Sequence, residues 1–170
     1  MKARRIVILV LVVLVAVAIQ TTVFVRIRPF DAAPSLVLLV VLAYARYLPA
    51  EFALLLGFGA GLLQDLLSDT PLGLWALVLT TLAFVTVRVR ERLEDDFGLL
   101  GPYVLVATVG ALTLFSVLGT IFGERTLADA AVLKKILLPA VYNTLLAPLI
   151  LAMAPRTLGV ARRRSASLSL

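Results

Sequence analysis

Long apolar segments, separated by short polar breaks, run along almost the whole chain. The segments cover residues 6–25, 33–48, 51–68, 71–88, 101–122 and 131–154. A helix needs about 20 residues to cross a hydrocarbon layer of roughly 30 Å, and most of these segments approach that length. The pattern predicts an all-α, polytopic membrane protein with six transmembrane helices, in which residues 1–170 form a single integral membrane domain.

The second segment, 33–48, is the shortest of the six. As a helix, the stretch between Pro34 and Pro49 rises only about 21 Å, which is less than the hydrocarbon thickness. Pro34 is well placed as a first helical residue, because that position has no intrahelical N–H bond to lose. We therefore predict that this segment spans the membrane, either by extending toward Phe30 or by thinning the bilayer locally.

The distribution of Lys and Arg supports an even number of spans. In the six-span arrangement, one side holds the larger set of basic residues, which is Lys2, Arg4, Arg5, Arg46, Arg88, Arg90, Arg92, Arg156, Arg162, Arg163 and Arg164. The other side holds Arg26, Arg28, Arg125, Lys134 and Lys135. Because cytoplasmic loops carry the excess of basic residues, both termini are predicted to be cytoplasmic. Residues 162–170 are predicted to form a basic tail, which is either disordered or attached electrostatically to anionic lipid, so that membrane lipid is an expected partner.

The N-terminus has a second interpretation. Lys2, Arg4 and Arg5, followed by an apolar run and small residues at 16–18, resemble a cleavable secretory signal. The run continues to Val25 and reaches the length of a span, which favours a retained helix. Cleavage would leave five spans and the same cytoplasmic C-terminus, so topology alone leaves this alternative open.

Composition excludes several classes of function. The chain is 62% apolar and 15% charged, with a mean hydropathy of +1.08. It has no Cys and no His, which excludes thiol chemistry, Ser-His-Asp triads and nearly all zinc, copper and haem sites. The net charge of +6 follows from the excess of basic residues in cytoplasmic loops. We therefore expect no metal, no cofactor and no nucleic-acid partner.

The third segment carries the densest pattern. Ala53, Gly57, Gly61 and Asp65 recur every four residues and so lie along one ridge of a helix. The spacing of the two glycines is typical of helices that pack closely in membranes. Asp65 is then expected to face protein near the outer end of its helix. It serves either as a structural hydrogen-bond acceptor or cap, or as a contact for a ligand or partner.

Other polar positions extend this region into a predicted cluster, either structural or partner-binding, made of Asp65, Ser68, Asp69, Trp75 and Asn143. Trp75 is interpreted either as an aromatic anchor at the membrane surface or as a platform for a ligand. Asn143 precedes Pro148, which leaves the carbonyl of Thr144 without a helical donor. We expect Asn143 or a neighbouring helix to take up that carbonyl, at a kink that is either architectural or part of a substrate pocket.

Two further stretches lie outside the spans. On the cytoplasmic side, Arg88, Arg90, Arg92, Glu94 and Asp95 continue the fourth helix, either as a solvated extension or as a docking surface for a partner. On the outer side, residues 126–129 (TLAD) fit a variant capping box that opens the last helix.

The stretch 57–77, GFGAGLLQDLLSDTPLGLWAL, resembles the hallmark stretch of the rod shape-determining protein MreD family. Residues 20–22 (QTT), 33–36 (APSL) and 143–148 are also similar to that family, so the resemblance covers nearly the whole chain. The chain departs from the family at Ser35, where members often carry an acidic residue after the proline.

The resemblance implies a multi-pass inner-membrane protein of the bacterial elongation machinery that binds MreC. Through MreC, it implies a link to the actin-like MreB filament, the SEDS glycosyltransferase and the class-B penicillin-binding protein that insert lateral peptidoglycan. It also implies a fold similar to the substrate-binding subunits of energy-coupling-factor transporters.

Three hypotheses of function follow. The first is a non-enzymatic membrane scaffold. The second is a substrate-binding subunit of a vitamin or small-nutrient transporter, for which the size and an outer polar cluster are suitable. The third is an intramembrane aspartyl protease using Asp65 and Asp129, which would require the two carboxylates to share a proton.

Overall fold

Helices account for all the regular structure that the computed structural model describes, which covers residues 3–26, 32–68, 70–95, 97–124, 126–127 and 129–159. The elements are α1 (Ala3–Arg26), α2 (Leu36–Ala45), α3 (Ala50–Leu66), α4 (Leu74–Asp95), the short 3-10 helix η2 (Phe97–Leu99), α5 (Leu100–Ile121) and α6 (Val132–Leu158). Each predicted apolar segment therefore overlaps one α-helix. The predicted tail, 162–170, lies outside the described residues.

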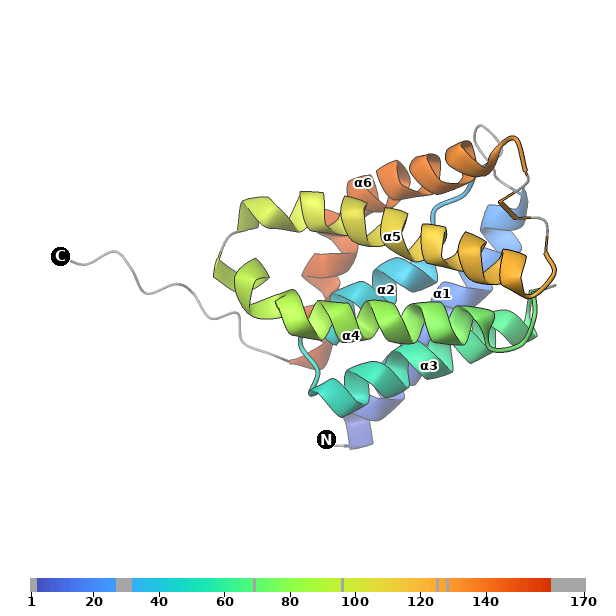
Figure 1. Cartoon of the computed structure of the whole chain (residues 1–170). Coiled ribbons are helices and arrows are strands. Elements are labelled where there is room, and N and C mark those ends of the chain that lie inside the picture. Colours follow the sequence, from blue (N-terminus) through green and yellow to red (C-terminus); the bar gives the residue numbers. More distant parts are fainter. Residues whose placement is uncertain are drawn as a thin grey trace.

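Helix α2 forms the centre of the bundle. Figure 1 shows it between α3 and α4 on one side and α5 and α6 on the other, and it contacts every other α-helix. All its residues are buried. A helix that is apolar on every face has no side suited to water, so burial among other helices is the arrangement its sequence favours.

The second segment differs from its predicted bounds. Instead of spanning 33–48, the helix is confined to Leu36–Ala45, a rise of only about 15 Å. Its ends therefore lie inside the bundle, where free backbone groups need protein partners. At the N-terminus, the side-chain Oε1 of Gln20 accepts a hydrogen bond from the N–H of Val37 at 2.9 Å. The Nδ2 of Asn143 donates to the carbonyl of Ser35 at 3.2 Å.

Helices α3 and α4 pack with their backbones in close contact, as the glycine ridge predicts. A Cβ added at Gly57 would lie 2.5 Å from the carbonyl oxygen of Leu79, and one added at Gly61 would lie 2.5 Å from the carbonyl carbon of Trp75. Ala53 is fully buried on the same ridge. A Cβ at Gly59, on the outer face of α3, would meet nothing within 4 Å.

Three of the described helices are long and apolar enough to cross a membrane by length and composition: α1 over Ala3–Phe24, α5 and α6. Their outer faces carry exposed apolar side chains, such as Leu11 on α1, Val106 on α5 and Leu145 on α6. Water would oppose such exposure, whereas lipid tolerates it. The bundle is thus a membrane domain.

The two ends of the bundle differ in character. Helix α1 begins and α6 ends at the same end (Figure 1), which also holds Arg46 and the arginines of α4. We call this the basic end. The opposite end, here called the pocket end, is formed by the C-termini of α1, α3 and α5 and the N-termini of α2, α4 and α6.

Candidate functional site

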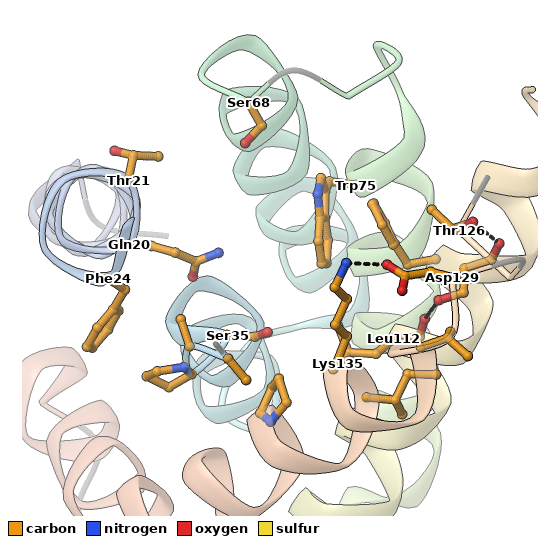
Figure 2. Close-up of a pocket in the computed structure, with 18 of the residues that line it drawn as sticks. Gln20, Thr21, Phe24, Ser35, Ser68, Trp75, Leu112, Thr126, Asp129 and Lys135 are labelled. Carbon is orange, nitrogen blue, oxygen red and sulfur yellow. Dashed lines mark hydrogen bonds and ion pairs between the residues drawn. The ribbon is translucent and has the colours of Figure 1, made fainter. Parts of the chain in front are cut away.

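A cavity of about 580 Å³ opens at the pocket end. Residues from all six α-helices or their adjoining loops line it, among them Gln20, Ser35, Ser68, Trp75, Phe115, Thr126, Asp129 and Lys135. Figure 2 shows Gln20 reaching in from α1 and the side chains of Trp75 and Lys135 on the facing side. The volume lies within the range of pockets that hold small molecules.

Asp65 lies behind this cavity and fixes the start of α4. Its carboxylate is 2% exposed. Oδ1 accepts hydrogen bonds from the Thr70 hydroxyl at 3.1 Å and the Trp75 N–H at 3.0 Å. Oδ2 accepts from the N–H groups of Gly73 at 3.0 Å and Ala76 at 3.2 Å. The carboxylate therefore caps the N-terminus of α4 from the end of α3, which is the structural role among the alternatives.

Trp75 owes its position to this cap and faces the cavity. Its side chain is largely buried, and its ring stacks on Phe115 of α5 with centroids 4.4 Å apart and an angle of 26° between the planes. The ring forms an aromatic wall of the cavity, which is the position that the platform interpretation requires. The sequence did not single out Phe115, because one aromatic residue within an apolar helix has no distinguishing pattern.

An ion pair borders the cavity at the start of α6. The Nζ of Lys135 donates to Oδ2 of Asp129, and the N–H of Ala131 donates to Oδ1 at 2.8 Å. The Lys135 hydrogen bond and then the Ala131 N–H lower the pKa of Asp129 below its usual value. The predicted capping box at residues 126–129 is wrong, because α6 begins only at Val132 with Ala131 as its N-cap. The Thr126 hydroxyl donates instead to the Ser116 carbonyl of α5 at 2.6 Å.

Asn143 lies in the core and not on the cavity wall. It is fully buried, and its Nδ2 donates to the Ser35 carbonyl and to the Thr108 hydroxyl at 3.4 Å. Its amide nitrogen is directed to α2 and α5, so Asn143 is not the partner of the Thr144 carbonyl, and the alternative of a neighbouring helix stays a prediction. Its Oδ1 has no hydrogen-bond partner among the described residues.

The predicted cluster thus divides into two groups. Ser68 and Trp75 line the cavity, whereas Asp65 and Asn143 hold the surrounding helices in place. Asp69 lies outside the described residues. Hydroxyl groups on the wall have no imidazole or thiolate to activate them, because the chain contains neither His nor Cys.

The cytoplasmic docking candidates on α4 have different surroundings. The Nη1 of Arg90 donates to the Leu48 carbonyl at 2.8 Å, which ties α4 to the turn between α2 and α3. The Arg88 guanidinium lies 5.0 Å from the centroid of the Phe84 ring. Arg88 and Arg92 are exposed. The side chains of Glu94 and Asp95 lie outside the described part of the chain.

Comparison with known proteins gives one match. A family model described as rod shape-determining protein MreD matches residues 2–155, which is most of the chain. Neither the curated proteins nor the solved structures contain a match to this sequence.

Proposed function

The chain belongs to the rod shape-determining protein MreD family and so has a role in determining rod shape, and we propose that it acts as a non-enzymatic scaffold of the elongation machinery. In this proposal it binds MreC and helps couple the MreB cytoskeleton to lateral peptidoglycan synthesis. The SEDS glycosyltransferase and the class-B penicillin-binding protein belong to the same complex. The family match carries the proposal.

We also propose that the bundle lies in the inner membrane with six transmembrane segments and both termini in the cytoplasm. Two observations support this arrangement. The described start of α1 and the described end of α6 lie at one end of the bundle (Figure 1). That end also carries the arginines of α4, in agreement with the excess of basic residues expected on the cytoplasmic side. In this arrangement, helix α2 lies in the protein core of the membrane domain, surrounded by the other helices.

The proposal that the protein is not an enzyme is supported by the partners of the Asp65 and Asp129 carboxylates. Asp65 accepts four hydrogen bonds from residues 70–76, and Asp129 is paired with Lys135. The two share no partner, whereas a protease dyad would share a proton. Within the described ranges, no group of three or more Asp or Glu side chains is arranged to hold a metal ion.

The cavity of about 580 Å³ favours a second candidate, a substrate-binding subunit of a transporter for a vitamin or other small nutrient. Its aromatic wall of Trp75 and Phe115 would stack on a planar ligand. Lys135 and the surrounding hydroxyl groups would orient polar substituents. The similarity to energy-coupling-factor subunits stays a prediction.

Co-purification from membranes tests the scaffold proposal. A tagged chain should recover MreC in constant proportion after detergent extraction, and failure to recover it would overturn the proposal. Depletion separates the two candidates: loss of rod shape supports the scaffold, whereas unchanged shape with loss of uptake of one nutrient supports the transporter.

A pair of charge reversals tests whether the exposed arginines of α4 form the docking surface. The double variant Arg88→Glu and Arg92→Glu should recover less MreC than wild type. The double variant Arg4→Glu and Arg156→Glu, at exposed sites on α1 and α6 at the same end, makes the same change of charge away from α4 and should leave recovery unchanged. Equal recovery from all variants would overturn the assignment of this surface.

A further inference from the structure

Arg46 is a buried cation at the basic end of the bundle. It follows the last residue of α2, and the residue is only 5% exposed. Among the described residues, no carboxylate forms an ion pair with it, and its Nε has no hydrogen-bond partner. Buried cations are normally paired, because removal from water is costly unless an opposite charge or hydrogen bonds replace the lost solvation.

Two local features compensate Arg46 only in part. The guanidinium lies 5.7 Å from the centroid of the Tyr47 ring, a weak cation–π contact at the outer limit of the useful range. The C-terminus of α2 also favours a positive charge nearby. Neither feature supplies an acceptor for the buried Nε–H. Arg46 also lines a cavity, so an anionic group held there would compensate the charge of its guanidinium.

Arg46 borders a cavity with space for such a group. The cavity has a volume of about 310 Å³ and lies between the end of α2, the start of α5 and the second half of α6. Leu100 and Gly101, in the first turn of α5, form part of its wall. The positive end of the α5 dipole favours an anion here, although η2 runs directly into α5 and Pro102 has no N–H to donate. A Cβ at Gly101 would meet nothing within 4 Å, so the space beside this turn is open.

The rest of the wall indicates what carries the anion. Ala147, Pro148 and Leu151 of α6 are apolar and line the cavity beside Arg46, and Pro148 is exposed on the outer surface of the bundle. A free anion would gain nothing from this apolar wall, whereas an acyl chain would bury surface against it. The position at the basic end also matches the depth of lipid headgroups if this end faces the cytoplasm.

We propose that this cavity is a binding site for an anionic phospholipid, whose phosphate contacts Arg46 and the first turn of α5 and whose acyl chain lies along α6. The guanidinium suits phosphate because its planar N–H groups can donate in pairs. The site is independent of the proposed contact with MreC, because it uses only residues of this chain and lipid.

Lipid retention measured by native mass spectrometry tests the proposal. The full chain is reconstituted separately with phosphatidylglycerol and phosphatidylcholine, then transferred to detergent. Arg46→Met removes the cation, and Gly101→Leu fills the cavity while leaving Arg46 in place. Gly59→Leu is the matched control, because it makes the same change at another helical position where a Cβ meets nothing within 4 Å. The fluorescence of the single tryptophan, at the opposite end, checks folding.

Wild type and Gly59→Leu should retain phosphatidylglycerol at least tenfold more than Arg46→Met and Gly101→Leu. Equal retention by Arg46→Met and wild type would overturn the proposal, whether or not Gly101→Leu folds. Equal retention of phosphatidylcholine by wild type would overturn the preference for an anionic lipid. Displacement of phosphatidylglycerol by millimolar inorganic phosphate would overturn the assignment to a lipid and indicate a free anion instead.

Discussion

The close packing of α3 on α4 makes a quantitative prediction for two glycines in the same helix. Gly61→Ala places a methyl group against the backbone of Trp75 and Ala76, with the Trp75 carbonyl carbon at 2.5 Å. Backbone cannot rotate away as a side chain can, so the two helices must separate. Gly59→Ala makes the same chemical change on the outer face, where a Cβ meets nothing within 4 Å.

The two substitutions are expected to change the free energy of unfolding in opposite directions. Forcing an extra carbon into a packed interface costs typically about 1–3 kcal/mol, and Gly61 is at the upper end because the atoms it meets are backbone atoms. At the open position, alanine is a better helix former than glycine by about 0.5–1 kcal/mol. The free energies of unfolding of the two variants should therefore differ by about 2–4 kcal/mol.

Unfolding by sodium dodecyl sulfate in mixed micelles measures this difference. The transition is followed by far-ultraviolet circular dichroism and by the emission of Trp75, whose backbone Gly61→Ala displaces directly. Gly61→Ala should unfold at a lower mole fraction of dodecyl sulfate than wild type, and Gly59→Ala at an equal or higher one. Equal transitions for the two variants would refute the reasoning, because the helices would then have room for a methyl group between them.

Three further predictions concern charged groups. Asp65→Asn should lower the free energy of unfolding by about 1.5–3 kcal/mol, which is the usual cost of losing hydrogen bonds to a charged acceptor. The substitution should also shift the emission of Trp75. An unshifted spectrum at unchanged stability would contradict the capping role of Asp65. Lys135→Met should raise the pKa of Asp129 toward its usual value, measured by a carboxyl carbon NMR titration. Because this pKa is lowered in the folded state, the stabilisation is full above the unfolded-state value and is lost as pH falls through the folded-state value. Arg90→Met should lower the free energy of unfolding by about 1 kcal/mol in the same assay, because the hydrogen bond to the Leu48 carbonyl is lost. Arg92→Met, at an exposed position, should change it by less than about 0.5 kcal/mol. Equal effects would show that the hydrogen bond from Arg90 contributes nothing.

The sequence by itself determined where helices form and how α3 meets its neighbour. Apolar segments bounded by Pro, Gly and charges specify helices in lipid, because only a helix satisfies its own backbone there. Glycines four residues apart mark a close contact, since the missing side chains allow two backbones to approach. Asp65, on the same ridge, had to face protein because lipid offers a carboxylate no partner.

Tertiary structure alone decided which helix is central and what surrounds the cavity. An apolar helix such as the one in residues 33–48 suits lipid and a protein core equally well, because both surroundings are apolar. Hydropathy therefore cannot distinguish a core helix from a lipid-facing span. The short core helix α2 then required acceptors and donors from distant residues, which Gln20 and Asn143 supply. Likewise, Trp75 meets Phe115 only because α4 and α5 pack side by side, and no local pattern in either helix encodes that contact.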